Sequence, residues 1–169
     1  DTDSETIAAD IENHFPDIAI IWRPDDLCGD MVSTNKVIEH DIGQLDGEYF
    51  LQTHCTNPLL TATTIDKAID CYFSNLDEHD SLFSVTRLQT RLYWENVKPV
   101  NHDIQNLIRT QDLPPIYEEN SCLYLFSKLS FAAAGGNRIG LRPQMFEISK
   151  LEAVDIDEPE DWILAQTLY

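Results

Sequence analysis

The sequence is poor in basic residues and has no long apolar run. Eleven Lys and Arg stand against thirty Asp and Glu, which gives a formal net charge of −19. Binding of nucleic acid depends on basic patches, so this composition argues against a nucleic-acid partner. No apolar run approaches the roughly 20 residues of a membrane helix, and no signal-peptide pattern opens the chain. We therefore expect a cytoplasmic protein with no membrane association.

Several motifs of well-known enzyme classes are also missing. The chain contains no G-x-G-x-x-G or Walker loop, no G-x-S-x-G elbow and no C-x-x-C pair. These absences argue against a dinucleotide fingerprint, a serine hydrolase and a zinc site of the usual spacing. The four cysteines are expected to be reduced.

The residues that are present predict a single α/β domain over residues 1–169. Apolar side chains at helical spacing alternate with short apolar strands. This alternation is typical of a mainly parallel sheet with helices on both faces. Helices are expected after a Thr2–Glu5 capping box, after Ser33, after Thr63 or Thr64, and at 158–168, with a short one ending at 132–136. Strands are expected at 18–22, from 49, and at 81–85, 121–126 and 145–148.

The middle of the chain, residues 86–120, is less regular and is long for a plain connection. We expect an excursion from the sheet, such as a binding or dimer-contact arm. Charge is also uneven here: residues 87–142 hold seven basic and five acidic residues, a net charge of +2, whereas the remainder carries −21. If the protein binds an anionic small molecule, this stretch is the expected place.

The sharpest chemical motif is Val154-Asp155-Ile156-Asp157. Carboxylates at i and i+2 of an extended segment point to the same side and can share a hard divalent cation such as Mg²⁺. The alternative is helix capping, because Asp157 precedes Pro159 at a predicted helix start. Both functions are compatible, with Asp157 capping and Asp155 binding.

Two further segments carry polar groups suited to ligands. Thr56-Asn57-Pro58-Leu59 follows a predicted strand, with His54 at the end of that strand. Arg109 opens a proline-stiffened stretch that ends at Tyr117, and its guanidinium could clamp a carboxylate or phosphate. Either segment could instead be an ordinary solvated loop.

Taken in order, six motifs resemble those of the acylneuraminate (CMP-sialic acid) cytidylyltransferase family. They span nearly the whole chain. Residues 2–8 are similar to S-T-D-D-E-x-I-A, 23–34 to R-P-x-x-L-A-x-D-x-x-S-T, 56–59 to T-S-P-L, 109–117 to R-R-Q-D-L-P-x-x-Y, 119–124 to E-N-G-A-I-Y, and 154–157 to V-D-I-D.

The resemblance implies a three-layer α/β/α nucleotidyltransferase (Rossmann-like) domain that forms a homodimer, with 86–120 as the dimer arm. The implied reaction joins a sialic-acid-like sugar acid to CTP, giving the CMP-sugar and pyrophosphate. Asp155 and Asp157 would be the catalytic, Mg²⁺-binding pair. The implied substrate-binding residues are His54, Thr56, Asn57, Arg109, Gln111, Asn120 and Tyr124.

The chain departs from the family pattern at several places. The family's opening strand and its R-x-x-S-K-x-x-x-x-K-N loop, which cradles the CTP phosphates, have no counterpart here. We therefore expect a domain incomplete at its N-terminus and a chain that is inactive by itself. Asn57 replaces Ser, Ser121 replaces Gly, and Leu60 replaces a frequent Arg. His54 stands where the family has Gln, unless a gap places Gln52 there. The alternative function is a non-catalytic family member that serves as a dimerisation or sugar-acid-binding module.

Overall fold

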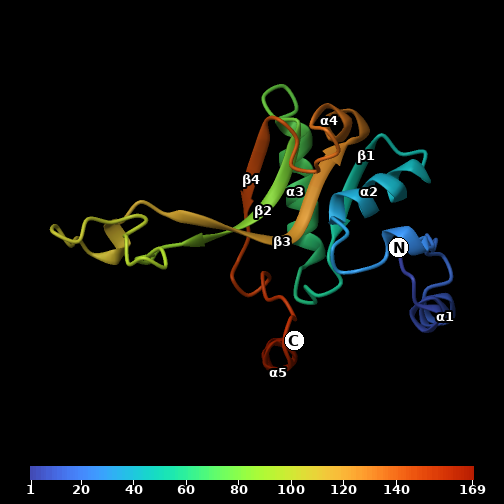
Figure 1. Cartoon of the computed structure of the whole chain (residues 1–169), viewed down its shortest axis with the longest axis horizontal. Coiled ribbons are helices and arrows are strands. Elements are labelled where there is room, and N and C mark those ends of the chain that lie inside the picture. Colours follow the sequence, from blue (N-terminus) through green and yellow to red (C-terminus); the bar gives the residue numbers. More distant parts are fainter.

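The computed structural model describes residues 1–169 as four strands and five α-helices joined by loops (Figure 1). In chain order the α-helices and strands are α1 (Glu5–His14), α2 (Thr34–Gly43), β1 (Tyr49–Thr53), α3 (Ala62–Ser74), β2 (Ser81–Leu88), β3 (Ile116–Ser127), α4 (Lys128–Ala133), β4 (Pro143–Glu147) and α5 (Pro159–Leu168). Two short 3₁₀ helices, η1 (Asp25–Leu27) and η2 (Thr110–Asp112), complete the elements. None of these helices has the length and apolarity that crossing a bilayer requires.

The α/β class is confirmed, but the sheet is mixed rather than mainly parallel. The strand order is β1-β3-β2-β4. β3 runs antiparallel to both β1 and β2, and only β2 and β4 are parallel. The reason lies in the connection from β2 to β3, which leaves the sheet and comes straight back beside the same strand. Such a return makes an antiparallel pair, whereas a parallel pair needs a crossover to the opposite end.

Alternate side chains of β3 build a core on each face of the sheet. Leu123 and Leu125 pack with Ala68 and Tyr72 of α3. Tyr124 and Phe126 of β3 face the other way. They form a second cluster of buried side chains with Ile38 of α2 and Phe131 of α4. This period of two is that of a strand buried on both faces. The sheet therefore lies between two helical layers, as expected.

Helix starts follow short polar side chains, with small shifts from the expected positions. Ser33 caps α2 as predicted, by accepting a hydrogen bond from the Asn35 N–H. α3 is capped by Thr61 rather than by Thr63 or Thr64. α1 is capped by Ser4, whereas Thr2 is buried. A side-chain oxygen at these sites satisfies N–H groups that have no partner within the helix.

The predicted strand at 18–22 is wrong. Its only pairing is a single bridge between Thr2 and Trp22. Ile18 and Trp22 are 56% and 52% exposed, so the run is not covered on both faces. A strand forms only beside a neighbouring strand whose backbone N–H and C=O groups can pair with it over several residues. Thr2 pairs with this segment at a single position.

The pairing of β2 with β3 contains an irregularity that affects the polar end of the sheet. Val85 pairs with Glu119 and Phe83 with Tyr124, so Ser84 alone lies opposite residues 120–123. Ser121 consequently adopts φ = 58°, in the left-handed region that favours glycine. The irregular pairing thus explains why the E-N-G-A-I-Y motif, which residues 119–124 resemble, has Gly at this position.

Residues 89–115, called the arm below, leave the sheet between β2 and β3. The arm projects away from the sheet on the side opposite α1 (Figure 1). Its internal order comes from one bridge between Tyr93 and Pro99, η2, and side-chain hydrogen bonds such as Asn101 Nδ2 to the Thr90 carbonyl at 2.7 Å. Trp94, Val97 and Leu107 on the arm are more than half exposed. The arm therefore presents apolar surface without a core of its own.

Replacing Ser121 with Gly is expected to stabilise the protein. A left-handed backbone costs an L-residue about 1–2 kcal/mol, and Gly loses about 0.5–1 kcal/mol in chain entropy. The net gain is expected to raise Tm by about 1–3 °C in a differential scanning calorimetry experiment. Ser121→Ala is the control, because it removes the hydroxyl and keeps the Cβ. A Gly variant no more stable than the Ala variant would show that the left-handed backbone at this position stores no strain.

Candidate functional site

The structure joins the two most distant of the predicted ligand-binding segments. The Ile156 N–H donates to the Thr56 carbonyl at 2.9 Å. Asn57 Nδ2 donates to the Val154 carbonyl at 3.2 Å. These two bonds hold the segment of Asp155 against the loop after β1, about 100 residues earlier in the chain. Thr56, Asn57 and Asp155 therefore belong to one polar region at the end of β1.

Asp155 has an uncommitted carboxylate oxygen inside this region. Its Oδ1 is shielded from solvent and has no hydrogen-bond partner. Asp157 does not cap α5, so this alternative is wrong: Glu158 holds the N-cap position, and Asp161 Oδ2 accepts from the Glu158 N–H at 2.9 Å. An acid one turn into the helix thus satisfies the free N–H groups, because it can reach back to them.

A small hollow of about 220 Å³ opens beside these two aspartates. Its lining residues are Glu118, Glu119, Asn120, Ser121, Ala153, Asp155 and Asp157. Four of the seven are acids and none is basic, which favours a cation over a bare anion. The chain nevertheless holds no cluster of three or more His, Cys, Asp or Glu side chains that could bind a metal. A divalent cation here would complete its coordination with substrate or water oxygens, as Mg²⁺ commonly does.

Tyr124 is the centre of a second polar cluster on the α2 side of the sheet. The Arg138 guanidinium lies 3.7 Å from the centroid of its ring. Gln52 pairs with Tyr124 across β1 and β3 and accepts from Arg138 Nη1 at 2.7 Å. The Tyr124 hydroxyl donates to Glu119 Oε1 at 2.5 Å, and the His54 ring lies 6.4 Å from the Tyr124 ring. The cluster therefore joins β1, β3 and the segment after α4.

Charge and burial both act on His54. Burial lowers the pKa of His54, and the positive charge of Arg138 lowers it further, while Asp155 acts in the opposite direction. The imidazole is consequently neutral at pH 7. Its Nε2 lies 3.1 Å from Gln52 Nε2, so a neutral ring can accept a hydrogen bond from the amide.

The largest polar cavity adjoins this cluster. It has a volume of about 510 Å³ and lies between α2 and the end of β1. His54, Thr56 and Gln52 contribute to its wall, together with Thr34 of α2. This volume is within the range of about 300–1,000 Å³ that small-molecule sites occupy. Hydroxyl, amide and imidazole groups line one part of it, and these groups suit a hydroxyl-rich ligand. The charged residues Asp1, Arg23 and Asp41 line another part, where Arg23 is paired with Asp1.

Asn120 has a structural function within the sheet. Its Oδ1 accepts from Ser84 Oγ at 2.6 Å and from the Cys122 N–H at 3.3 Å, and its Nδ2 donates to Thr86 Oγ1 at 2.9 Å. The residue is 9% exposed. Asn120 thus borders the acidic hollow, but its amide forms the hydrogen bonds that connect β2 and β3 where their regular pairing is interrupted.

The structure places Arg109 and Gln111 on the arm, apart from the other predicted site residues (Figure 1). The Arg109 side chain is 73% exposed and forms an ion pair with Asp112 at 2.7 Å. Within one chain these two residues contact neither the cluster around Tyr124 nor the acidic hollow. Their predicted substrate-binding function remains a prediction.

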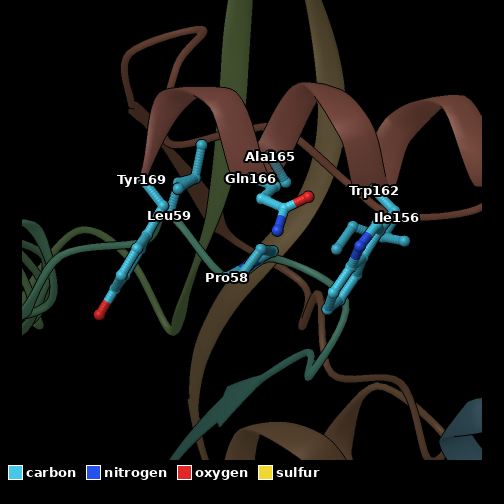
Figure 2. Close-up of a pocket in the computed structure, with 7 residues that line it drawn as sticks. All are labelled: Pro58, Leu59, Ile156, Trp162, Ala165, Gln166 and Tyr169. Atoms are coloured by element: carbon cyan, nitrogen blue, oxygen red, sulfur yellow. The ribbon is translucent and has the colours of Figure 1, made fainter.

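A separate pocket of about 230 Å³ lies under α5 (Figure 2). Its lining contains no charged residue: Pro58, Leu59, Ile156, Trp162, Ala165, Gln166 and Tyr169. Figure 2 shows the Pro58 ring beneath the helix, between the side chains of Leu59 and Trp162. The apolar half of the Thr56–Leu59 motif therefore anchors α5, while its polar half faces the site.

Sequence reasoning missed Arg138 as a site residue and treated Gln52 only as an alternative for His54. Gln52 lies on β1 and His54 directly follows it, two residues on in the extended chain, so the two side chains share a face and this spacing could have identified both. No local pattern marks Arg138. Its position depends on how the segment after α4 returns across Tyr124.

The fold is that of an α/β protein with a mixed sheet between two helical layers and polar groups at one end of the sheet. The sequence profile of the cytidylyltransferase family matches residues 1–167, and the chain belongs to this family. The membership supports CTP-dependent nucleotidyl transfer as its class of reaction. The more specific acylneuraminate subfamily is not distinguished by this match.

A comparison of solved structures supports the same fold. A 4-diphosphocytidyl-2C-methyl-D-erythritol synthase from Anaerococcus prevotii superposes with a TM-score of 0.64 at 14% sequence identity, over 96% of this chain and 75% of that chain. At this identity the likeness concerns the fold alone. A search of curated protein sequences finds no match.

Replacing Asn120 with Ala is expected to lower stability. The change leaves the Ser84 and Thr86 hydroxyls and the Cys122 N–H without their partner inside the sheet, which costs about 1–3 kcal/mol. Urea unfolding measures the loss. Asn106→Ala, on an exposed part of the arm, is the control and is expected to change stability by less than about 0.5 kcal/mol. Equal stability of the two variants would show that the network contributes little.

Proposed function

We propose that this protein activates a sialic-acid-like sugar acid with CTP, giving the CMP-sugar and pyrophosphate. The observation that carries the proposal is the junction of the Asp155 segment with the Thr56–Asn57 loop. This junction holds the uncommitted carboxylate of the acidic hollow against the loop that lines the 510 Å³ cavity. The family membership supports CTP as the donor. The six motifs of the acylneuraminate pattern support a sugar acid as the acceptor.

The proposed reaction is a displacement at phosphorus. The anomeric hydroxyl oxygen of the sugar acid forms a bond to the α-phosphorus of CTP, and the bond from that phosphorus to the bridging oxygen breaks. Pyrophosphate leaves with the electron pair of this bond, and the hydroxyl proton is released. The protein has little covalent chemistry to perform in such a step, so positioning and charge stabilisation supply the rate enhancement.

Asp155 and Asp157 are the residues proposed to hold Mg²⁺. The unpartnered Oδ1 of Asp155 and the acidic lining of the small hollow suit a hard cation that takes its remaining ligands from substrate or water oxygens. When bound, Mg²⁺ would neutralise charge on the phosphates. The carboxylates also need that cation, because without it their charge would repel CTP.

The acceptor is proposed to occupy the 510 Å³ cavity. His54 and Thr56 line this cavity, and Tyr124 and Asn57 support its wall. Hydroxyl and neutral imidazole groups exchange hydrogen bonds with sugar hydroxyls without adding charge. The cavity adjoins the segment of Asp155 through the Thr56–Ile156 bond, so an acceptor there would lie near the proposed metal pair.

The arm is proposed to bind a second copy of the chain. Its exposed apolar side chains lack a partner, and residues 89–115 hold three acidic and three basic residues. The arm therefore carries no net charge in a chain of net charge −19. Two copies repel each other over most of their surface, and a neutral apolar arm is the segment that can approach at least cost. Arg109 and Gln111 would then lie at the contact.

Asp155→Asn is expected to reduce product formation strongly while the fold remains. Activity is measured on the full-length gene product, as CMP-sugar formation from CTP and N-acetylneuraminate. Loss of a metal-binding charge is expected to reduce kcat/KM on the order of 10³-fold. Asp66→Asn, an exposed acid on α3, is the control for charge and is expected to keep full activity.

Excess chelator is expected to stop the unmodified enzyme. Turnover in chelator, or an Asp155→Asn variant within threefold of normal, would overturn the metal assignment.

Charges placed on the arm are expected to dissociate the dimer. The double variant Trp94→Glu/Leu107→Glu adds repulsion to the apolar surface, and sedimentation at micromolar concentration is expected to change from dimer to monomer. Leu129→Glu changes a still more exposed leucine, on α4 away from the arm, and is the control. A monomeric starting protein, or a dimer unaffected by the arm variant, would contradict the proposed interface.

A further inference from the structure

Arg138 is a positioned cation without an acidic partner. None of the four ion pairs in the structure includes it. Its side chain is partly buried, lies over the Tyr124 ring and donates through Nη1 to Gln52 Oε1. The edge formed by Nε and Nη2 donates to no protein atom. A guanidinium has five N–H donors, so stacking and one hydrogen bond fix its orientation and leave a free fork.

Nine of the eleven Lys and Arg residues form no ion pair, but most of these nine are exposed, whereas Arg138 is partly buried. Partial burial of a charge is costly unless a counter-charge or hydrogen bonds compensate for it. Asp155 and Glu119 both lie nearby, but Glu119 accepts the Tyr124 hydroxyl hydrogen bond, and Asp155 forms no ion pair. His54 is neutral, since its pKa is lowered. Arg138 is therefore the only positive charge of the cluster around Tyr124.

We propose that Arg138 binds the carboxylate of the acceptor through its free Nε–Nη2 edge. The inference rests on the proposed function, because it assigns the acidic group of that acceptor to a residue. A planar fork of two N–H groups matches a carboxylate in two parallel hydrogen bonds. Gln52 and Tyr124 act as positioning residues: Gln52 accepts a hydrogen bond from Nη1, and the Tyr124 ring lies against the face of the guanidinium.

The geometry favours the carboxylate of the acceptor over the phosphates of CTP. Gln52 and His54, which adjoin Arg138, are in the wall of the 510 Å³ cavity. The acidic hollow at Asp155 and Asp157 is the place for phosphates that carry a divalent cation. A single guanidinium balances a single carboxylate, whereas a triphosphate needs more positive charge than this cluster supplies.

Binding of N-acetylneuraminate, its methyl ester and sodium acetate to the chain tests the inference. Binding is followed by NMR, including the Nε–H resonance of Arg138, which is assigned by its loss in Arg138→Gln. Arg138→Gln is expected to weaken N-acetylneuraminate at least about tenfold and to change the weaker binding of the ester less than twofold. Arg138→Lys keeps the charge without the fork and is expected to recover only part of the loss. Arg87→Gln removes the same charge from an exposed position on β2 and is expected to have no effect.

The outcomes separate this inference from the proposed function. Unchanged acid binding by Arg138→Gln would overturn the role of Arg138 and leave the proposed function intact. If N-acetylneuraminate fails to bind but acetate shifts the Arg138 resonance, the carboxylate site is supported and the sialic-acid assignment fails. If neither acid perturbs that resonance, the inference is overturned. A larger effect of Arg138→Gln on KM for CTP than on KM for the sugar acid would also overturn it.

Discussion

The antiparallel pairing of β3 with β1 and β2 is the constraint on which the rest of the structure depends. β3 lies between these two strands and sends Leu123 and Leu125 into one core and Tyr124 and Phe126 into the other. A shift of its register by one residue would exchange the two sets between α3 and α2. The same register places Tyr124 opposite Gln52, so the packing of the core also fixes the polar cluster.

The irregular part of β3 connects this core to the site. Ser84 and Asn120 close the extra residues with side-chain hydrogen bonds, and Ser121 takes a left-handed backbone to complete the turn. In a regular strand Glu119, five residues before Tyr124, would lie further from it and on the opposite face, and its hydrogen bond to the tyrosine hydroxyl would not form. The left-handed backbone of Ser121 therefore lowers the stability of the fold at the point where β3 meets the candidate site.

The sequence was sufficient to predict those strands and helix caps that depend only on neighbouring residues. Strands from 49 and 81 and the cap at Ser33 could be predicted because apolar alternation and capping need only neighbouring residues. The strand at 18–22 could not be judged from its composition, since a strand exists only with a partner. The direction of β3 depended on the path of the arm. Asp155, Thr56 and Asn57 were predicted by motif, whereas Arg138 enters the site through packing after α4, which no short pattern encodes.

The charge of the protein limits how it can hold two anions. At a net charge of −19, long-range forces repel both CTP and a sugar acid, but screening reduces these forces beyond about 8–10 Å in physiological salt. Short-range groups therefore decide binding. The acids at 155 and 157 can attract a cation that reverses the local sign, and Arg138 supplies a fixed positive charge beside the cavity. In the proposed function, the separation of these two sites would let one chain distinguish a metal-bound triphosphate from a free carboxylate by position as well as by charge.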